Sequence, residues 1–227
     1  MEEKKTFLRR VPLFSDVRDK DLKNVLKMVT ERRYRKGSYM FFEKEPGNTL
    51  FLIICGLVKI YKSDSSGRIK TLTYLKEGDF FGEMAMLDEE VRSASAQVMQ
   101  DTHVLVLERA NFHKEIMSNP LIALKVMKTL SSRLRVADKQ LEDLTFRNLP
   151  GRVASTLLDL AEKHGEKTKD GMRINLPLTH QELAEMVGTA REAVTSILGD
   201  FRDAKAIQIH NKLITIVNKE ELTSWIT

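Results

Sequence analysis

The sequence predicts an α+β fold: an N-terminal antiparallel β-roll, a long helix and a C-terminal winged helix-turn-helix. Short apolar runs separated by turn residues fill most of the first half of the 227-residue chain, a pattern typical of a small antiparallel barrel or roll. A seam of apolar residues at heptad spacing follows, and two short helical patterns joined by a glycine precede a final hairpin pattern. The expected domains are therefore residues 1–118, 119–147 and 148–227.

Composition narrows the class of protein. The chain is 42% hydrophobic and 30% charged, and no apolar run approaches the roughly 18–20 residues that span a bilayer. The opening residues MEEKKTFLRR lack the apolar core of a secretory signal, and the single Cys55 excludes an internal disulfide framework. We therefore expect a cytoplasmic protein with no membrane partner.

Net charge alone says little about partners. The value of +5 at pH 7 favours a polyanionic partner. Residues 146–227, however, contain 11 Lys and Arg against 11 Asp and Glu, so the excess lies in the first 145 residues. DNA binding by the C-terminal segment must therefore be argued from a motif.

The elements of the roll follow from turn residues and apolar runs. The first 30 residues are expected to form a peripheral helical segment, with Ser15 or Asp16 as a helix cap. The apolar side of this helix would carry Leu22, Val25, Leu26 and Val29. Strands are expected at Tyr39–Phe42, Thr49–Ile54, Val58–Tyr61, Ile69–Tyr74, Ser95–Val98 and His103–Leu107.

The segment Phe80–Ser95, FFGEMAMLDEEVRSAS, is the strongest candidate for a ligand loop. Gly82 carries no Cβ and lets a backbone N–H approach a ligand closely. Glu83 offers an acceptor for a sugar hydroxyl, Arg92 offers a planar fork that matches a phosphate, and Ser93 adds a donor. The segment therefore predicts a loop for an anionic ligand with hydroxyl groups. The alternative is a tight turn followed by an exposed arginine.

A long helix is expected from Pro120, with Ser118 or Asn119 as its cap. Its apolar seam, with spacings of 3, 4, 3, 4 and 3, comprises Met127, Leu130, Leu134, Ala137, Leu141 and Leu144. So regular and narrow a seam favours pairing with a second copy in a homodimer. The alternative is a helix that packs on its own domain. The residues Asn148–Gly151 would break the helix and form a hinge.

The last segment has the pattern of a helix-turn-helix with a wing. A helix at Arg152–Lys163 and a strand at Arg173–Leu178 come first. Thr179 and Glu182 form a capping box, and Gly188 suits the turn between two short helices.

The second of these helices begins near Arg191. Its buried side would carry Val194, Ile197, Leu198 and Phe201. A hairpin wing is expected from Ile207–Ile209 and Leu213–Val217.

Together these patterns resemble the bacterial family of the cyclic-AMP receptor protein and the fumarate-nitrate-reduction regulator, the CRP/FNR family. The resemblance runs from about Phe7 to Val217 and is most specific at Gly82–Ala94, LEDLTFRNLPGRVA and LTHQELAEMVGTAREAVTSIL. It implies a dimeric transcription factor rather than an enzyme, with a cyclic nucleotide, cAMP first, as its effector. It also implies a pseudo-palindromic double-stranded DNA site and RNA polymerase as partners.

The resemblance also assigns ligand residues. It matches Glu83 to the acceptor of the ribose hydroxyl, Arg92 and Ser93 to the ligands of the cyclic phosphate, and Arg133 to an arginine near the same pocket. The remaining residues of the binding segment are Gly82, Met84 and Ala94.

The base-reading positions of the cyclic-AMP receptor protein, a threonine and a serine, correspond here to Ala137 and Asp138. An ionised Asp138 only accepts hydrogen bonds. It suits either the adenine amino group or the two N–H groups of guanine, which leaves cGMP open. The alternative is a solvated Asp138 with no ligand role.

For DNA, the resemblance places Arg191 and Glu192 in the major groove, where Arg suits guanine O6/N7 and Glu suits cytosine N4. Ser196, beside Thr195, stands where a second arginine normally follows, so the half-site should differ in part. Phosphate contacts are expected from Thr179, Gln181 and Thr189. The alternative for Arg191 and Glu192 is an ion pair at the helix N-terminus.

Other members of this family sense with an iron–sulfur cluster or haem, and two other functional classes are alternatives to a nucleotide-gated regulator. An iron–sulfur cluster needs several cysteines, and Cys55 is alone. Haem remains possible through His103 or His113, although no pair of ligands stands out, and we expect no metal site and no catalytic site. Two other classes are a regulator of this fold that needs no small molecule and a nucleotide-binding module that acts on a protein partner.

Overall fold

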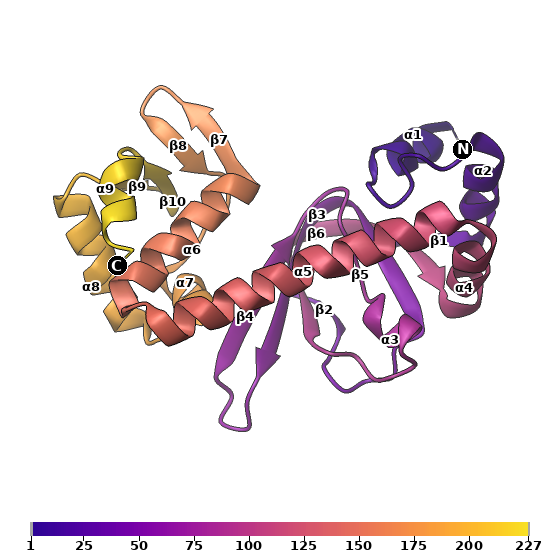
Figure 1. Ribbon diagram of the computed structural model, residues 1–227, viewed down its shortest axis with the longest axis horizontal. Coiled ribbons are helices and arrows are strands. Elements are labelled where there is room, and N and C mark those ends of the chain that lie inside the picture. The colour runs from indigo at the N-terminus through magenta and orange to yellow at the C-terminus, as the bar shows by residue number, and fades with distance from the viewer. Residues whose placement is uncertain (1, 227) are drawn as a thin grey trace. The chain divides into compact units, whose positions relative to one another are not determined.

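The computed structural model describes residues 2–226 and divides the chain into two compact units. One unit contains the residues up to Ser63 together with Leu72–Arg133, and the other contains Asp64–Thr71 together with Leu134 and the residues after it. The division falls inside α5 (Pro120–Phe146), which Figure 1 shows as one uninterrupted helix.

The expected antiparallel roll is present as a six-stranded sheet. Its strands are β1 (Val29–Tyr34), β2 (Tyr39–Phe41), β3 (Thr49–Ser63), β4 (Ile69–Leu75), β5 (Phe80–Phe81) and β6 (Ser95–Glu108). The order is β1-β6-β3-β4, with β2 paired to β6 and β5 paired to β3. The strand β6 runs antiparallel to β1, β2 and β3, and therefore holds the sheet together.

Two predicted breaks in the sheet are wrong, because β3 and β6 each continue where two strands were expected. The register between them shifts around Cys55 and Leu57. Gly56 has φ +105°, and a Cβ there would lie 2.3 Å from Thr102 Oγ1. The strand therefore bulges at this glycine instead of ending.

The N-terminal segment is part of the core, which corrects the prediction that it is peripheral. It folds as α1 (Glu2–Arg10) and α2 (Asp19–Met28), and the buried residues of this segment include Leu8, Phe14 and Leu22. They pack in one cluster with Leu50 and Leu105 of the sheet.

The predicted helix cap in this segment is also wrong. The residue before α2 is Arg18, which makes no side-chain cap, and Asp16 instead pairs with Lys125 at 2.5 Å. Val29 begins β1 rather than extending the helix.

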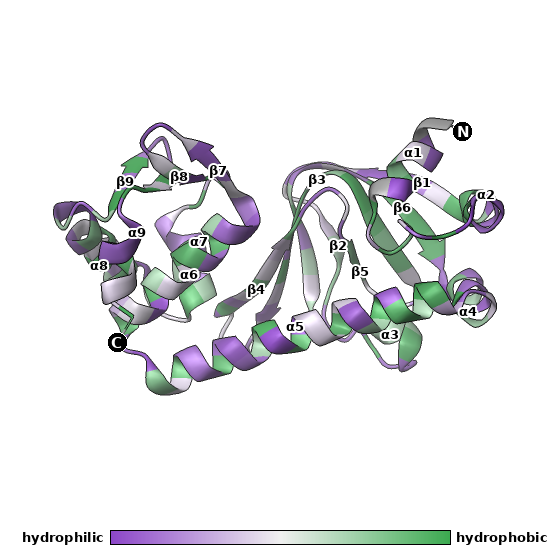
Figure 2. Cartoon of the chain, turned by 45° about the horizontal axis from the view of Figure 1, so that its top comes forward, coloured by the Kyte–Doolittle hydropathy of each residue, from purple (hydrophilic) through white to green (hydrophobic). Residues whose placement is uncertain are grey.

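After the sheet come α4 (Arg109–Ser118), which was not predicted, and α5. The start of α5 agrees with the prediction: Asn119 Oδ1 accepts a hydrogen bond from the backbone N–H of Leu121 at 3.2 Å. Most of the predicted seam is exposed in the single chain, with exposed fractions of 55% for Met127, 62% for Leu134 and 65% for Leu141. Figure 2 shows apolar and polar bands alternating along this helix.

The second unit contains the winged helix-turn-helix. Its elements are α6 (Leu149–His164), β7 (Gly165–Thr168), β8 (Gly171–Ile174), α7 (His180–Val187), α8 (Arg191–Asp203), β9 (Ile207–His210), β10 (Leu213–Ile216) and α9 (Lys219–Ser224). The four strands form one sheet in the order β7-β8-β10-β9.

The wing β9–β10 agrees with the prediction. It turns through two residues with positive φ, Asn211 at 49° and Lys212 at 65°, as a tight type I′ hairpin requires.

In this unit β7 and α9 were not predicted, and several boundaries differ from those predicted. The strand expected at Arg173–Leu178 ends at Ile174, and Leu176 and Leu178 are buried outside any strand. The break after α5 covers only Arg147 and Asn148, because Leu149 already begins α6. Pro150 fits the first turn of α6, because the N–H that proline lacks would have no helical partner at this position.

Candidate ligand loop and DNA-reading surface

Arg92 is buried under the ligand loop and is held by backbone carbonyls. Only 4% of the residue is exposed. Its Nη1 donates to the carbonyl of Gly82 and its Nη2 to that of Thr49, both at 2.9 Å, and the guanidinium lies 4.3 Å from the ring centroid of Phe41. Its Nε has no hydrogen-bond partner among the described residues. Burial lowers the pKa of Arg92, but the group keeps its charge because an arginine starts so far above neutrality.

The structure gives Gly82 a role that the sequence did not reveal. Its φ is +85°, and a Cβ there would lie 2.5 Å from Arg92 Nη1 and 2.8 Å from the carbonyl oxygen of Thr49. The glycine therefore makes room for the arginine, beyond allowing a ligand to approach its own backbone.

Glu83 and Arg133 meet although they are far apart in sequence. Glu83 follows β5 and is 1% exposed, and Arg133 lies on α5. Glu83 Oε1 accepts from Arg133 Nη1 at 2.5 Å, and Arg133 Nη2 donates to the carbonyl of Phe80 at 2.5 Å. The second carboxylate oxygen, Oε2, is buried and has no hydrogen-bond partner among the described residues.

The other predicted residues of the loop differ in their exposure to solvent. Ser93 is exposed, with its hydroxyl 3.5 Å from the sulfur of Met84, which is also exposed. Ala94 is buried. The hydroxyl of Ser93 is therefore accessible from solvent.

Arg109 anchors the loop and was missed by the sequence reasoning. Its Nη2 donates to the carbonyls of Gly47 and Ala85, both at 2.8 Å, and so ties the turn before β3 to the short helix α3 (Met84–Leu87). Nothing in its sequence context distinguishes it from other arginines at strand ends.

Asp138 is exposed on α5 and does not share a side of the helix with Arg133. Five residues separate the two, which corresponds to about 140° around a helix of 3.6 residues per turn. Ala137, four residues from Arg133, lies on nearly the same side. The helix therefore does not bring Asp138 to the face that contacts Glu83.

The helix-turn-helix has the caps that the sequence predicted. Thr179 Oγ1 accepts from the backbone N–H of Glu182 at 3.1 Å, and Glu182 Oε2 accepts from the backbone N–H of Thr179 at 2.7 Å. Gly188 ends α7 with φ +79°. The buried side of α8 comprises the predicted residues Val194, Ile197, Leu198 and Phe201.

The predicted base-reading residues share the solvent side of α8. Arg191, Glu192, Thr195 and Ser196 are all exposed. Within the described residues, Arg191 and Glu192 form no ion pair with each other, which speaks against the alternative reading of this pair. Thr195 Oγ1 donates to the carbonyl of Arg191 at 2.9 Å, and the same oxygen lies 2.8 Å from His180 Nδ1.

The predicted phosphate-contacting residues differ in availability. The hydroxyl of Thr179 is engaged in the cap. Gln181 is exposed and its Nε2 donates to Glu185 Oε1 at 3.3 Å, and Thr189 is half-buried. His180, which links α7 to α8 through Thr195, was missed, because a histidine after a cap residue gives no signal of its own.

Residues 2–226 contain neither a candidate membrane-spanning helix nor a candidate cluster of metal ligands. None of the helices in this range has the length and apolar character needed to cross a bilayer. In the same range, no three His, Cys, Asp or Glu side chains are grouped so as to hold a metal ion.

Two family models match the chain. Residues 31–119 match the cyclic nucleotide-binding domain, and residues 151–225 match the Crp-like helix-turn-helix domain. The CRP-like cAMP-activated global transcriptional regulator of Mycobacterium tuberculosis is 33% identical over 95% of this chain and 96% of its own length. The anaerobic regulatory protein of Bacillus subtilis is 35% identical over 95% of this chain and 91% of its own.

Solved structures agree with these matches. A mutant of CooA from Carboxydothermus hydrogenoformans superposes with a TM-score of 0.78 at 26% identity, over 89% of this chain and 90% of that one. The catabolite activator protein of Thermus thermophilus gives 0.55 at 30% identity, over 95% of this chain and all of that one. The chain therefore belongs to the CRP/FNR family of transcriptional regulators and combines a cyclic nucleotide-binding domain with a Crp-like helix-turn-helix domain.

Proposed function

We propose that this protein is a homodimeric transcriptional regulator whose affinity for a pseudo-palindromic operator is gated by a cyclic purine nucleotide in the roll. cAMP is the first candidate effector and cGMP the second. Residues 1–118 act as the sensor, 119–147 as the dimerisation helix and 148–227 as the DNA-binding domain. Because DNA and RNA polymerase are its proposed partners, the protein works in the bacterial cytoplasm.

The observation that carries the proposal is the set of unsatisfied polar atoms at the ligand loop. Glu83 Oε2 and Arg92 Nε are buried without hydrogen-bond partners among the described residues, and the Ser93 hydroxyl is exposed beside them in sequence. Buried polar atoms without partners destabilise a fold. A ligand with a sugar hydroxyl and a phosphate offers a donor to Glu83 and acceptors to Arg92 and Ser93.

The choice of nucleotide rests on residues of this chain, because similar relatives differ in description. The regulator of Mycobacterium tuberculosis is described as cAMP-activated, and the similarly identical protein of Bacillus subtilis as an anaerobic regulator. Ala137 offers no hydroxyl, so Asp138 is the only polar side chain of the two base-reading positions. Its carboxylate suits the adenine amino group and also suits guanine, but α5 does not bring Asp138 to the side of the helix that contacts Glu83, so this position does not by itself favour either nucleotide.

A second candidate function is a regulator of this family that needs no ligand. Two observations favour it. Both Nη atoms of Arg92 are satisfied by the protein's own carbonyls, and one oxygen of Glu83 is satisfied by Arg133. Much of the hydrogen-bonding capacity of Arg92 and Glu83 is therefore satisfied without a nucleotide.

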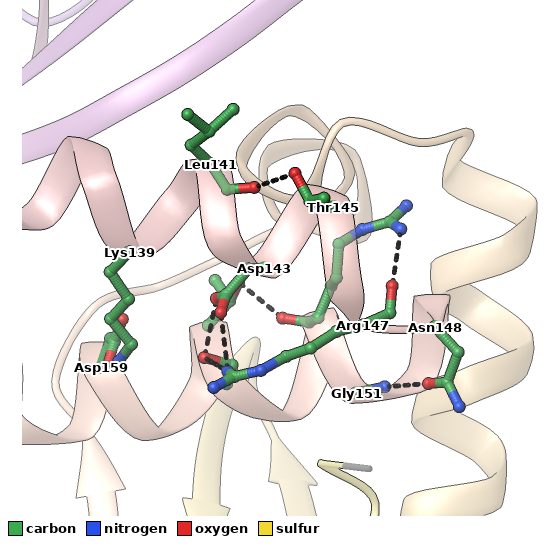
Figure 3. A network of polar contacts seen from close by, with 11 residues as sticks. Lys139, Leu141, Asp143, Thr145, Arg147, Asn148, Gly151 and Asp159 are labelled. Carbon is green, nitrogen blue, oxygen red and sulfur yellow. Dashed lines mark hydrogen bonds and ion pairs between the residues drawn. The ribbon is translucent and has the colours of Figure 1, made fainter.

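The proposed route from ligand to DNA follows α5 into α6. A polar network joins the two helices around the short break at Arg147 and Asn148 (Figure 3). Arg147 Nη1 pairs with Asp143 at 2.8 Å and donates to Ser155 Oγ at 2.7 Å, and Ser155 Oγ donates to Asp143 Oδ2 at 2.9 Å.

Two further contacts strengthen this junction. Lys139 of α5 forms an ion pair with Asp159 of α6, and Asn148 Oδ1 accepts from the backbone N–H of Gly151 at 2.8 Å. The last turns of α5 and the first turns of α6 are thereby fixed to each other. A ligand that displaces α5 would therefore also reorient α6 and the helix-turn-helix behind it.

Calorimetry with cAMP and cGMP tests the sensor function. Ser93→Ala is preferred over a change at Arg92, because Arg92 also supports the carbonyls of Gly82 and Thr49. Loss of one hydrogen bond to a charged phosphate should weaken binding about tenfold. Ser224→Ala in α9 is the control and should bind like the wild type. A wild type that binds neither nucleotide at millimolar concentration would favour the ligand-independent candidate.

A DNA mobility-shift assay tests the proposed contacts of the helix-turn-helix with DNA. Arg191→Ala should cost about 1–3 kcal/mol and relax specificity at one G·C pair per half-site. Gln181→Ala should instead weaken binding to all sequences nearly alike, because a phosphate contact carries no sequence information. Half-sites should lie about one turn of DNA, ~34 Å, apart. Equal loss of affinity on all sequences for Arg191→Ala would contradict the assignment.

A further inference from the structure

Gly199 is an unexplained glycine in the interior of α8. The helix runs from Arg191 to Asp203 and Gly199 keeps a helical conformation, since it is absent from the glycines with positive φ. A glycine inside a helix is destabilising relative to alanine because it loses more backbone freedom on folding.

The fold itself gives no reason for this glycine. A Cβ placed at Gly199 would meet no heavy atom within 4 Å. Two other glycines of the same unit are crowded: a Cβ would lie 3.0 Å from the carbonyl oxygen of Trp225 at Gly151, and 2.0 Å from that of Ala161 at Gly165. Gly188, at the end of α7, is instead explained by its φ of +79°. Packing within the chain therefore explains the glycines at 151 and 165. No such contact explains Gly199, so a binding partner is the remaining reason for a glycine there.

The position of Gly199 on the helix points to that cause. It follows Glu192 by seven residues, about two turns, and Thr195 by four, so all three lie on one side of α8. The buried residues, among them Val194 and Leu198, occupy the opposite side. Gly199 is half-buried and lies on the side of α8 that carries the base-reading residues.

We propose that Gly199 marks the point where the DNA backbone comes closest to α8, and that the missing Cβ sets how deeply the helix enters the major groove. This inference rests on the proposed reading of DNA by α8. Gly199 lies about 12 Å along the helix axis from Arg191, and the base edges are contacted by the N-terminal residues of a recognition helix. When the first turn of α8 reaches the base edges, a position this far along the helix meets the sugar-phosphate wall of the groove.

The consequence is a positioning role for a residue without a side chain. Any group added at Gly199 would push α8 outward and withdraw Arg191 and Glu192 from the base edges. The cost to helix stability is then offset in the complex with DNA. Alanine at this position should stabilise the free protein and weaken the complex.

A size series at position 199 tests the inference in the full-length dimer. The probe is the DNA duplex that the wild type selects from a random library, with cAMP, with cGMP or with neither. We expect Gly199→Ala to bind this duplex about threefold to tenfold more weakly, and Gly199→Leu more than tenfold more weakly. Both variants should keep the wild-type affinity for nucleotide, and the melting temperature of Gly199→Ala should be equal or higher. Thr223→Leu, an exposed neutral position in α9, is the control for a surface leucine and should bind like the wild type.

The outcomes separate this inference from the proposed function. If the Ala and Leu variants bind the selected duplex as tightly as the wild type, the close approach does not exist. If Gly199→Lys binds more tightly, the position lies near phosphate with room to spare, which also overturns the inference. A wild type that selects no duplex would overturn DNA reading by α8, and the inference with it.

Discussion

Glu83 and Arg133, 50 residues apart in sequence, form a hydrogen-bonded ion pair of 2.5 Å between the ligand loop and α5. Glu83 is 1% exposed, whereas 36% of the Arg133 side chain is exposed. A ligand whose hydroxyl engages Glu83 would act on the same carboxylate that α5 holds. The loop and the helix are therefore linked through one side chain.

The first prediction concerns this pair. Arg133→Gln leaves a buried carboxylate without its cation, which should lower the free energy of unfolding by about 1–3 kcal/mol in urea, less than for a fully buried pair because Arg133 is partly solvated. The double variant with Glu83→Gln should recover part of the loss. Strictly additive effects of the two substitutions would show that the pair contributes no coupling energy.

The second prediction concerns the dimer. Leu134→Glu with Leu141→Glu should give a monomer in sedimentation at micromolar concentration, because an unpaired charge in a dry interface is costly. Both leucines are exposed in the single chain, so the helical circular dichroism should persist. Leu130 is a poor choice for this test because it packs against the core of the roll. A double variant that stays dimeric would show that the seam is not the interface.

The third prediction concerns base choice. Asp138→Ser replaces an acceptor by a hydroxyl that both donates and accepts. If Asp138 reads the base, the ratio of cAMP to cGMP affinity should rise, as measured by calorimetry. Asp138 is exposed, so the substitution should leave the folding stability nearly unchanged. An unchanged ratio would show that Asp138 is a solvated residue with no role in binding the base.

The fourth prediction concerns the junction of α5 and α6. Ser155 is 2% exposed and stands between Asp143 and Arg147. Ser155→Ala should lower the free energy of unfolding by about 1–3 kcal/mol, because two charged groups lose a partner. It should also change operator affinity while nucleotide affinity in the absence of DNA stays the same. Ser224→Ala serves as the control and should bind the operator like the wild type. If Ser155→Ala also binds the operator as tightly as the wild type, the network plays no part in the coupling.

The local features of this fold could be predicted from the sequence, because a few neighbouring residues determine them. The capping box of Thr179 and Glu182, the left-handed Gly188 and the cap at Asn119 are examples. The buried side of α8 follows from helical periodicity alone.

The features that were missed depend on contacts distant in sequence. The strand β1, VTERRY, has no apolar alternation and exists because it pairs with β6. Gly56 could not be identified as a bulge without Thr102 beside it. Likewise, the carbonyl partners of Arg92 come from Thr49 and Gly82, and no spacing in the sequence predicts that convergence.

We propose that nucleotide binding and DNA binding are coupled in the homodimer. The most direct test measures nucleotide affinity by calorimetry with and without the selected operator duplex. If ligand favours the DNA-binding state, the operator must raise nucleotide affinity by the same factor by which nucleotide raises operator affinity, typically about 5-fold to 150-fold. Equal nucleotide affinity in the presence and absence of the operator would contradict the account, because the two sites would then be independent.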